Sequence, residues 1–363
     1  MTFQRFGFIG LGLITGSIAR AIRNKYPDAV ITAYDPGSES LVEALADGTI
    51  DKALPAIGPD FCRCEIVFLG APVSKNAENL PLIKPFLSRD AILTDVGSVK
   101  THIHAHVVSE GLSAQFIGGH PMTGSERVGY RNSKARLLEN AYYILTPEPE
   151  FPPEKTERMK AFVASLGAMP LIIDCDEHDY CTAAISHVPH VAAAALVNLV
   201  KSSDGPDGIM KTIAAGGFKD ITRISSSSPA VWQQICLSNR DRILSLLDDY
   251  IRGLADVRND IAAADGEALY GFFDSARRYR DSFSEKAGGP ILPVYSVRVD
   301  IADRPGVLAR VVSLLAEHRI NIRNIGIVHN REYQEGALRV ELDSREEQRR
   351  AGALLLQNGY SLH

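Results

Sequence analysis

Two short stretches of this chain place a hydroxyl or an ionisable side chain directly behind a run of apolar residues. In GGHPMTGSE (118–126), His120 stands between two glycines and a proline, after the apolar run AQFI. In DVGSVK (95–100), Ser98 follows the apolar run AILT. Such runs are typical of buried strands, and ligands of a parallel sheet bind beyond the carboxyl ends of its strands. We therefore expect both residues to face a crevice, where a neutral imidazole could accept a proton. The alternative is that His120 only caps a loop.

A third stretch, GGFKDITRIS (216–225), carries two cations in a segment rich in glycine and serine. The guanidinium of Arg223 could hold a carboxylate through two parallel hydrogen bonds, and Lys219 lies four residues before it. The alternative for Arg223 is a surface ion pair with Asp220. Trp232, the only tryptophan, could wall an apolar pocket, although large aromatic side chains are more often part of a core.

Three further histidines lie in a helix-like segment over residues 176–201. His187 and His190 are three residues apart and share one helix face, and His178 lies further upstream. A zinc site would need acidic or thiol ligands at a defined spacing, and none recurs there. We therefore prefer substrate hydrogen bonding or core packing for these rings.

A histidine triplet follows Ser98, in a segment that the sequence predicts to be helical. Residues spaced by two would line one face of a strand, but around a helix they spread over the cylinder. We therefore expect His102, His104 and His106 to lie on a solvated helix surface.

The elements that must position these residues begin with the opening segment FGFIGLGLITGSIARAIRN, a strand that turns on glycines into a helix. Gly10 permits the tight turn, and Gly12 lets the backbone approach a pyrophosphate at the positive end of the helix. The third position of G-x-G-x-x-G is Thr15, with Gly16 one residue later. Asp35 ends the next strand, where a carboxylate accepts from ribose hydroxyls and repels a 2′-phosphate, which favours NAD over NADP.

Strands then alternate with helices up to about residue 175, which predicts a mostly parallel, doubly wound Rossmann-like sheet. The strands are expected in AVITAYDP and at 64–72, 91–97, 114–119, 141–147 and 169–175. The segment after residue 175 is predicted to be purely helical. It contains a regular apolar stripe on one helix face, which suits either a dimer surface or an internal core. The stripe consists of Ile243, Leu247, Tyr250, Leu254, Val257 and Ile261.

Beyond the linker-like KAGGP (286–290), the pattern is strand, helix, strand, strand, helix, strand, as in a ferredoxin-like βαββαβ module. We expect its core helix to begin at DRPG and to bury Val307, Val311, Leu314 and Leu315. The predicted domains are 1–174 (dinucleotide-binding), 175–289 (helical, substrate-binding and dimerising) and 290–363 (regulatory).

Composition limits the function classes. The chain has 363 residues, a formal charge of −5 and 45% hydrophobic residues, without a long basic run, so we expect small-molecule partners rather than nucleic acid or a membrane surface. The five cysteines show no C-x-x-C spacing, and neither a signal peptide nor a membrane-spanning run is evident. A cytoplasmic protein with reduced thiols is the simplest interpretation.

Taken together, GLGLITGS, DVGSVK, GGHPMTGSE, the SHVPH histidines and DITRIS resemble the prephenate dehydrogenase family, in that family's order. The C-terminal module, with DRPGVLARV and HRINIRNI, is similar to the amino-acid-binding ACT domain. Thr15 departs from the family's usual glycine. The resemblance implies oxidative decarboxylation of prephenate to 4-hydroxyphenylpyruvate with reduction of NAD, in tyrosine biosynthesis, by a homodimer with tyrosine as an allosteric effector.

The resemblance also assigns roles by motif. The catalytic residues would be His120, Ser98 and Arg223, and the substrate pocket would include His190, His178, Lys219 and Ser125. The cofactor would be held by Gly10, Leu11, Gly12, Leu13, Ile14, Asp35, Ala71 and Pro72. The effector would bind near Asp303, Pro305, Gly306, Asn321 and Ile322, and no metal site is expected.

Three alternatives stay open at this point. Arogenate differs from prephenate only where the side-chain keto group becomes an ammonium, and no residue decides securely between them. A β-hydroxyacid dehydrogenase would share the nucleotide-binding domain but would normally use a catalytic lysine. A non-catalytic sensor of dinucleotide and amino acid is the third.

Overall fold

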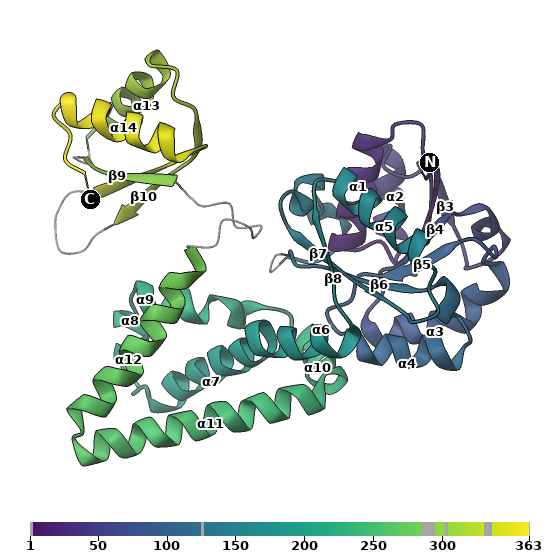
Figure 1. The fold of residues 1–363 in the computed structure, drawn as a ribbon, viewed down its shortest axis with the longest axis horizontal. Helices are drawn as coiled ribbons and strands as arrows, with labels where there is room; N and C mark the ends of the chain where they lie inside the picture. The colour runs from purple at the N-terminus through teal and green to yellow at the C-terminus, as the bar shows by residue number, and fades with distance from the viewer. Residues whose placement is uncertain (1–2, 125–126, 285–294, 302–303, 330–335, 363) are drawn as a thin grey trace. The chain divides into compact units, whose positions relative to one another are not determined.

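The computed structural model describes residues 3–124, 127–284, 295–301, 304–329 and 336–362 (Figure 1). Ser125, Asp303 and the predicted linker 286–290 therefore lie outside the described residues. The chain forms two compact units, Met1–Leu269 and Tyr270–His363. The first contains all of the residues predicted for cofactor and substrate.

A five-stranded parallel sheet opens the first unit, in the order β3-β2-β1-β4-β5. The strand order reverses at β1, which pairs with both β2 and β4, so a crevice for a ligand opens where the loops after these strands diverge. The strands are β1 (Arg5–Ile9), β2 (Val30–Tyr34), β3 (Lys52–Leu54), β4 (Ile66–Leu69) and β5 (Ile92–Asp95).

Helices cover both faces of this sheet, and the side chains of each strand alternate between two cores. In β4, Ile66 and Phe68 pack in one core with α1 and α5, whereas Val67 and Leu69 pack in the other with α3 and α4. In Figure 1, α1 and α5 lie above the sheet and α3 and α4 below it. Burial on both faces explains the continuous apolar runs in the sequence. The helices are α1 (Leu13–Lys25), α2 (Ser38–Ala46), α3 (Val73–Ile83), α4 (Thr101–Ser109) and α5 (Pro153–Ser165).

The predicted alternation continues in a separate three-stranded sheet, β6-β7-β8, in which β6 runs antiparallel to β7. The strand expected at 114–119 instead spans 117–121, because Ser113–Gln115 form a 3₁₀ turn. His120 was expected just after this strand, but it lies within it and pairs with Ile144. The strands are β6 (Ile117–Pro121), β7 (Tyr142–Pro147) and β8 (Met169–Ile172).

The two glycines before His120 are required by close packing. A Cβ on Gly118 would lie 2.2 Å from Oγ1 of Thr146, and one on Gly119 would lie 2.5 Å from the carbonyl oxygen of Asp95. Larger residues would therefore push β6 away from β5 and β7, and His120 would move with it.

The glycine loop is also explained by packing. Thr15, at the third motif position, fits because Gly70 faces it, and a Cβ on Gly70 would lie 2.3 Å from the Thr15 methyl. The Thr15 hydroxyl accepts a hydrogen bond from the Gly12 amide at 3.0 Å. Gly16 makes room for Tyr130 and Ser133, which pack onto α1.

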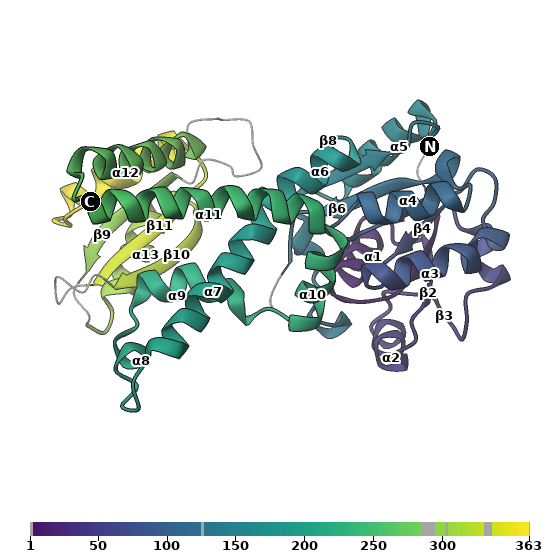
Figure 2. The same cartoon turned by 90° about the horizontal axis from the view of Figure 1, so that it is seen from below.

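The second half of this unit is helical. It comprises α6 (Cys175–Thr182), α7 (Val188–Ser203), α8 (Ile209–Ile213), α9 (Gly216–Thr222), α10 (Pro229–Ser238), α11 (Arg240–Ala263) and the start of α12 (Gly266–Asp281). A π-helical turn, Ala183–His187, joins α6 to α7, and Pro189 lies in the first turn of α7. Figure 2 shows α11 as one long helix, and Ile243 near its start packs on Ala183 and Val188.

The α6–α7 segment, Cys175–Ser203, is long and apolar enough to cross a membrane by length and composition, contrary to the expectation that no run approached this size. Its helix is continuous through the π-turn, within the segment 176–201 that the sequence predicts to be helix-like. It nevertheless holds Asp179, which is fully buried and bonded to α4, so it belongs to the packed unit.

The second unit contains β9 (Tyr295–Ile301), α13 (Val307–Glu317), β10 (Ile322–His329), β11 (Gly336–Leu342) and α14 (Arg345–Gln357). Its sheet has the order β10-β11-β9, and Leu362 forms a single antiparallel bridge with Val299 in place of the predicted last strand. This is the expected ferredoxin-like arrangement. Val311 and Leu315 are buried, and Val307 and Leu314 pack against the same core.

We predict that Gly16→Ala destabilises the protein, because its Cβ would lie 2.7 Å from the Tyr130 ring. Overpacking of this kind costs about 1–3 kcal/mol in free energy of unfolding. The matched control is Gly12→Ala, whose Cβ meets nothing within 4 Å and whose φ of −92° is ordinary. Denaturant unfolding of both variants checks this; equal stability of the two would contradict it.

Candidate active site

A cleft of ≈ 870 Å³ lies between the glycine loop and the helical half of the first unit. Of the predicted residues, Gly12, Leu13, Ile14, Ala71, Pro72, Ser98, His120, His190 and Arg223 line it. Gly10, Leu11, Asp35 and His178 are not among its lining residues. Lys219 is exposed on α9 and does not line the cleft either.

The glycine loop forms a cradle that a dinucleotide fits. Gly10 has a φ of +93°, and a Cβ there would lie 2.7 Å from the Ala71 amide nitrogen. A Cβ on Gly12 would project into open space, so a ligand can approach the backbone at the N-terminus of α1. Asp35 accepts a hydrogen bond from the Leu11 amide at 2.7 Å, which fixes a carboxylate beside the loop.

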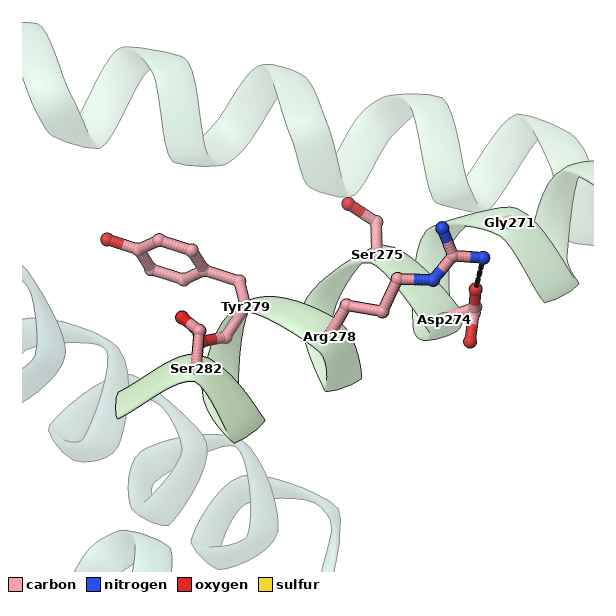
Figure 3. Close-up of a pocket in the computed structure, with 6 residues that line it drawn as sticks. All are labelled: Gly271, Asp274, Ser275, Arg278, Tyr279 and Ser282. Carbon is pink, nitrogen blue, oxygen red and sulfur yellow. Dashed lines mark hydrogen bonds and ion pairs between the residues drawn. The ribbon is translucent and has the colours of Figure 1, made fainter. Parts of the chain in front are cut away.

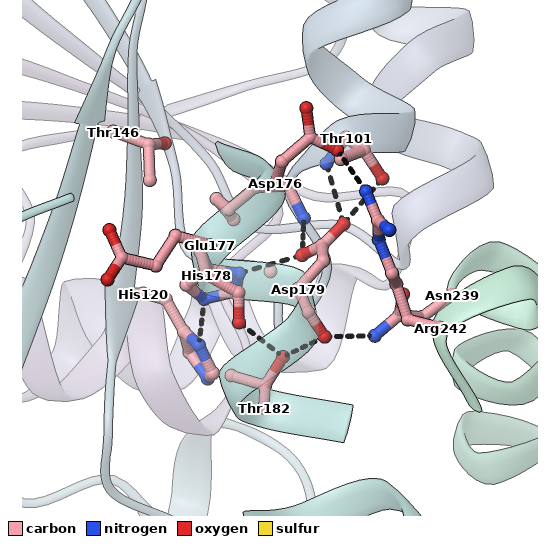
Figure 4. Close-up of polar contacts among 12 residues, drawn as sticks. Thr101, His120, Thr146, Asp176, Glu177, His178, Asp179, Thr182, Asn239 and Arg242 are labelled. Atoms are coloured by element: carbon pink, nitrogen blue, oxygen red, sulfur yellow. Dashed lines mark hydrogen bonds and ion pairs between the residues drawn. The ribbon is translucent and has the colours of Figure 1, made fainter. Parts of the chain in front are cut away.

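His120, which lines the cleft, begins a series of hydrogen bonds that leads through His178 to the buried Asp179 (Figure 4). Nδ1 of His120 lies 2.8 Å from Nε2 of His178, and Nδ1 of His178 lies 2.7 Å from Oδ1 of Asp179. Burial, together with the neighbouring His178 and Lys100, holds the pKa of His120 well below its usual 6.5. His120 is therefore neutral at pH 7, which is the state that can accept a proton.

Both carboxylate oxygens of Asp179 accept hydrogen bonds. Its carboxylate accepts from the amides of Lys100 and Thr101 at 2.7 and 2.8 Å, and from the Thr101 hydroxyl. Burial alone would raise the pKa of Asp179, but hydrogen bonds from His178, Thr101 and Lys100 hold it below its usual value. The carboxylate is thus ionised at neutral pH.

A buried ion pair between Lys100 and Asp95 positions β6. Lys100 is 0% exposed, and its ammonium donates to the Asp95 carboxylate and to the Gly119 carbonyl oxygen, the latter at 2.7 Å. Asp95 in turn accepts from the Gly119 amide at 3.1 Å. Burial lowers the pKa of Lys100, although Asp95 opposes the shift. This pair links the two sheets next to His120.

The helical wall of the cleft carries an aromatic stack. The His190 ring lies on Trp232 with centroids 3.6 Å apart, and Nδ1 of His190 donates to the Ser186 carbonyl oxygen at 2.9 Å. His187 lies edge-on to the same Trp232, with centroids 6.0 Å apart. Burial lowers the pKa of His187 to about 4, so this ring is also neutral at pH 7. No group of three or more metal-ligating side chains occurs among the described residues.

The expected solvated surface for the histidine triplet is wrong at its middle member. His104 is buried, and its two ring nitrogens bond Glu148 and, at 2.8 Å, the Thr146 hydroxyl. The α4 helix turns His104 toward β7, while His106 remains exposed. Burial lowers the pKa of His104, despite the nearby Glu148.

Sequence reasoning missed four polar residues behind the cleft: Asp95, Lys100, Asp179 and Asn239. Asp95 and Lys100 are the two ends of the DVGSVK motif, and an acid and a base in an otherwise apolar run were a signal for a buried pair. Asp179 and Asn239 lie 60 residues apart in the sequence, and no local pattern joins them.

A second hollow lies on the surface of the other unit (Figure 3). Its lining residues belong to α12 and the single turn that follows it, and they are Gly271, Asp274, Ser275, Arg278, Tyr279 and Ser282. Arg278 pairs with Asp274 at 2.5 Å. Because these residues come from one continuous helical segment, the hollow offers no converging groups for chemistry.

The parallel sheet, the glycine cradle and the neutral histidine define a dinucleotide-dependent dehydrogenase. Family models match in sequence order: "Prephenate dehydrogenase, nucleotide-binding domain" over residues 18–171, "Prephenate dehydrogenase, dimerization domain" over 174–275, and "ACT domain" over 295–338. Prephenate dehydrogenase of Bacillus subtilis is 38% identical over 344 residues, covering 94% of this chain and 93% of that protein.

Two solved structures are also similar. Prephenate dehydrogenase from A. aeolicus, in complex with hydroxyphenyl propionate and NAD⁺, has a TM-score of 0.73 at 28% identity, covering 78% of this chain and 99% of its own. Synechocystis arogenate dehydrogenase has a TM-score of 0.69 at 27% identity, covering 77% and 99%. The chain belongs to the prephenate dehydrogenase family and is an NAD-dependent oxidoreductase.

Proposed function

We propose that this chain converts prephenate to 4-hydroxyphenylpyruvate with NAD, and that His120 is its proton acceptor. The observation that carries the proposal is a neutral histidine that lines the cleft beside the glycine loop and hydrogen-bonds away from it through Nδ1. The other ring nitrogen, Nε2, is then the atom available to a substrate hydroxyl. Family membership and the B. subtilis relative support the same reaction.

The chemistry of prephenate matches these groups. Prephenate is a cyclohexadienol with a ring carboxylate and a pyruvyl side chain, and NAD held at the glycine loop would supply the hydride acceptor for the carbinol carbon. His120 accepts the hydroxyl proton, and the ring carboxylate leaves as carbon dioxide while its bonding electrons move through the ring to the former hydroxyl oxygen. His120 then returns its proton to that oxygen, giving the phenol. Prephenate and NAD thus yield 4-hydroxyphenylpyruvate, carbon dioxide and NADH, with no net proton.

The other roles follow from position and chemistry. Ser98 orients the ring hydroxyl, and Arg223 holds a substrate carboxylate, because both line the cleft. His190 contributes a polar edge stacked on Trp232. His178 does not line the cleft but hydrogen-bonds His120, which does. Lys219, which the family motifs place in the substrate pocket, lies outside the cleft lining.

Arogenate is the second candidate substrate, favoured by the similarity to the Synechocystis arogenate dehydrogenase. It differs by an ammonium in place of the keto group. The ratio of kcat/KM for the two substrates assigns the preference.

We predict that His120→Asn lowers kcat by about 10²–10⁴-fold with prephenate, the range for loss of a general base. Asparagine can still donate a hydrogen bond to His178 from near the position of Nδ1. The variant therefore keeps this hydrogen bond and removes only Nε2, the proposed proton acceptor. In the wild type, kcat/KM falls only below pH 6.5, where His120 becomes protonated, because burial lowers its pKa. NADH absorbance at 340 nm, read while prephenate is consumed, measures the rate.

The control is His106→Asn, an exposed ring on α4 that lies outside the cleft lining. Full activity in His120→Asn would remove the assignment. Binding of NAD without reduction by prephenate or arogenate would instead favour the sensor interpretation.

We further propose that tyrosine binds the C-terminal module and regulates the reaction. The match to the ACT family model supports an amino-acid effector. Pro305 and Gly306 precede α13, and Gly306 has a φ of +85° that favours glycine. Asn321 donates to Asp343 at 2.8 Å, and Ile322 begins β10. The proposed role of Asp303 lies outside the described residues.

We expect tyrosine to change the rate of the wild type, with a weaker response in Asn321→Ala at unchanged basal kcat. An effector must bind two states unequally to regulate, so calorimetry should accompany the rates. Tyrosine that neither binds nor changes the rate of the wild type would overturn this proposal.

We also propose a homodimer, formed through the seam on α11. Tyr250, Leu254 and Ile261 are 43%, 51% and 63% exposed, which is unusual for a regular apolar stripe. The "dimerization domain" model covers this helix.

We predict that Leu254→Asp converts the dimer to a monomer, because a charge would be buried at the interface. Light scattering gives the mass, and Asp256→Asn is the control on the same helix. A wild-type monomer would contradict the proposal.

A cytoplasmic location is proposed as well. All five cysteines are free thiols, as expected in a reducing compartment.

A further inference from the structure

Asp179 is connected to two histidines that line the cleft through two separate arms of hydrogen bonds. Its carboxylate leads through His178 to His120, and its backbone carbonyl leads through Asn239 to His187. The carboxylate contacts Nδ1 of His178, whose Nε2 contacts His120. The carbonyl oxygen of Asp179 accepts from Nδ2 of Asn239 at 2.8 Å, and the same Nδ2 lies 3.1 Å from Nδ1 of His187. Figure 4 shows both contacts of Asp179.

The first arm fixes a proton position by elimination. An ionised carboxylate can only accept, so Nδ1 of His178 carries its hydrogen. Burial keeps the pKa of His178 below its usual value, so the ring is neutral and its Nε2 carries a lone pair and no hydrogen. That lone pair must receive the hydrogen of His120 Nδ1 at 2.8 Å, which leaves Nε2 of His120 as an acceptor.

The second arm gives the opposite result. A carbonyl oxygen cannot donate, so the atom of Asn239 next to it is the amide nitrogen, with both hydrogens available as donors. Nδ1 of His187 must therefore accept from this nitrogen. A neutral His187 then carries its proton on Nε2, on the ring that lines the cleft.

The conformation of Asn239 supports a dedicated role. Asn239 is the N-cap of α11, a position where an asparagine side chain usually accepts from the first turn of the helix. It makes no such hydrogen bond here. Its side chain is buried and turned back toward Asp179 and His187.

We propose that Asp179 sets the hydrogen-bonding polarity of the cleft through two arms. The His178 arm makes Nε2 of His120 an acceptor, and the Asn239 arm makes Nε2 of His187 a donor. Asp179, His178 and Asn239 are positioning residues, since none of them lines the cleft. The consequence for catalysis rests on the proposed function, whereas the tautomers themselves do not.

A pair of near-isosteric variants tests the first arm. In His178→Gln, the amide nitrogen can donate to Asp179 and the amide oxygen can accept from His120, so the polarity of the arm is kept. In His178→Met, the size is similar but both hydrogen bonds are lost. We expect His178→Gln to hold kcat within about tenfold of the wild type and His178→Met to lose a further 10- to 100-fold, as for other lost orienting partners.

The tautomers are read directly by ¹⁵N–¹H long-range NMR of the full chain labelled in histidine, without substrate. His178→Met should release the tautomer of His120 and leave that of His187 unchanged. Asn239→Leu should do the reverse. Thermal unfolding and NAD binding, measured on the same samples, separate these effects from loss of fold.

The outcomes are distinct. A protonated Nε2 on His120 in the wild type, or equal tautomers and kcat in His178→Gln and His178→Met, would overturn the proposal. If the tautomers respond as expected but the wild type does not oxidise prephenate, the proposed function fails and the assignment of the two arms stands.

Discussion

The carboxylate of Asp179 at the N-terminus of α4 is the interaction on which the cleft depends. It comes from α6, in the helical half of the first unit, and it accepts the first free amides of a helix in the nucleotide-binding half. The partial positive charge of a helix N-terminus favours an anion there. A buried charge is stable only when its hydrogen bonds are all made, so this site fixes how the helical half meets the sheets.

The cleft is mostly neutral around its reacting position for the same physical reason. Burial lowers the pKa of His120, His178 and His187. Nδ1 of each ring forms a hydrogen bond with a buried neighbour behind the cleft. Of the charges behind the cleft, Lys100 and Asp95 compensate one another, and the Asp179 carboxylate is compensated by the hydrogen bonds it accepts at the N-terminus of α4. A substrate with two carboxylates thus finds imidazoles that accept or donate hydrogen bonds without competing for its charge.

Much of the fold could be predicted from the sequence, because it depends on local patterns. The glycine loop, the apolar strands and the helix Val307–Glu317 are encoded within a few residues each. The separate sheet of β6, β7 and β8 could not be predicted, since β6 pairs antiparallel with β7 and is held beside β5 by contacts of Lys100 and Asp95 with Gly119 that no local pattern encodes. In the same way, Ser98, His120 and Arg223 were found by motif, whereas Asp179 and Asn239 are joined only by tertiary contact.

The π-turn Ala183–His187 has a consequence for how the two walls of the cleft are aligned. Each residue advances an α-helix by about 100°, so a turn that accommodates one extra residue resets the rotational phase of everything after it. His178 and Asp179 precede the turn and face the sheets, and His190 follows it and faces Trp232. The removal of one residue here would leave a continuous helix of good propensity and would still rotate His190 out of phase with His178. The number of residues between the acidic helix α6 and the SHVPH motif is therefore constrained, because it sets the angle between His178 and His190 around the helix axis.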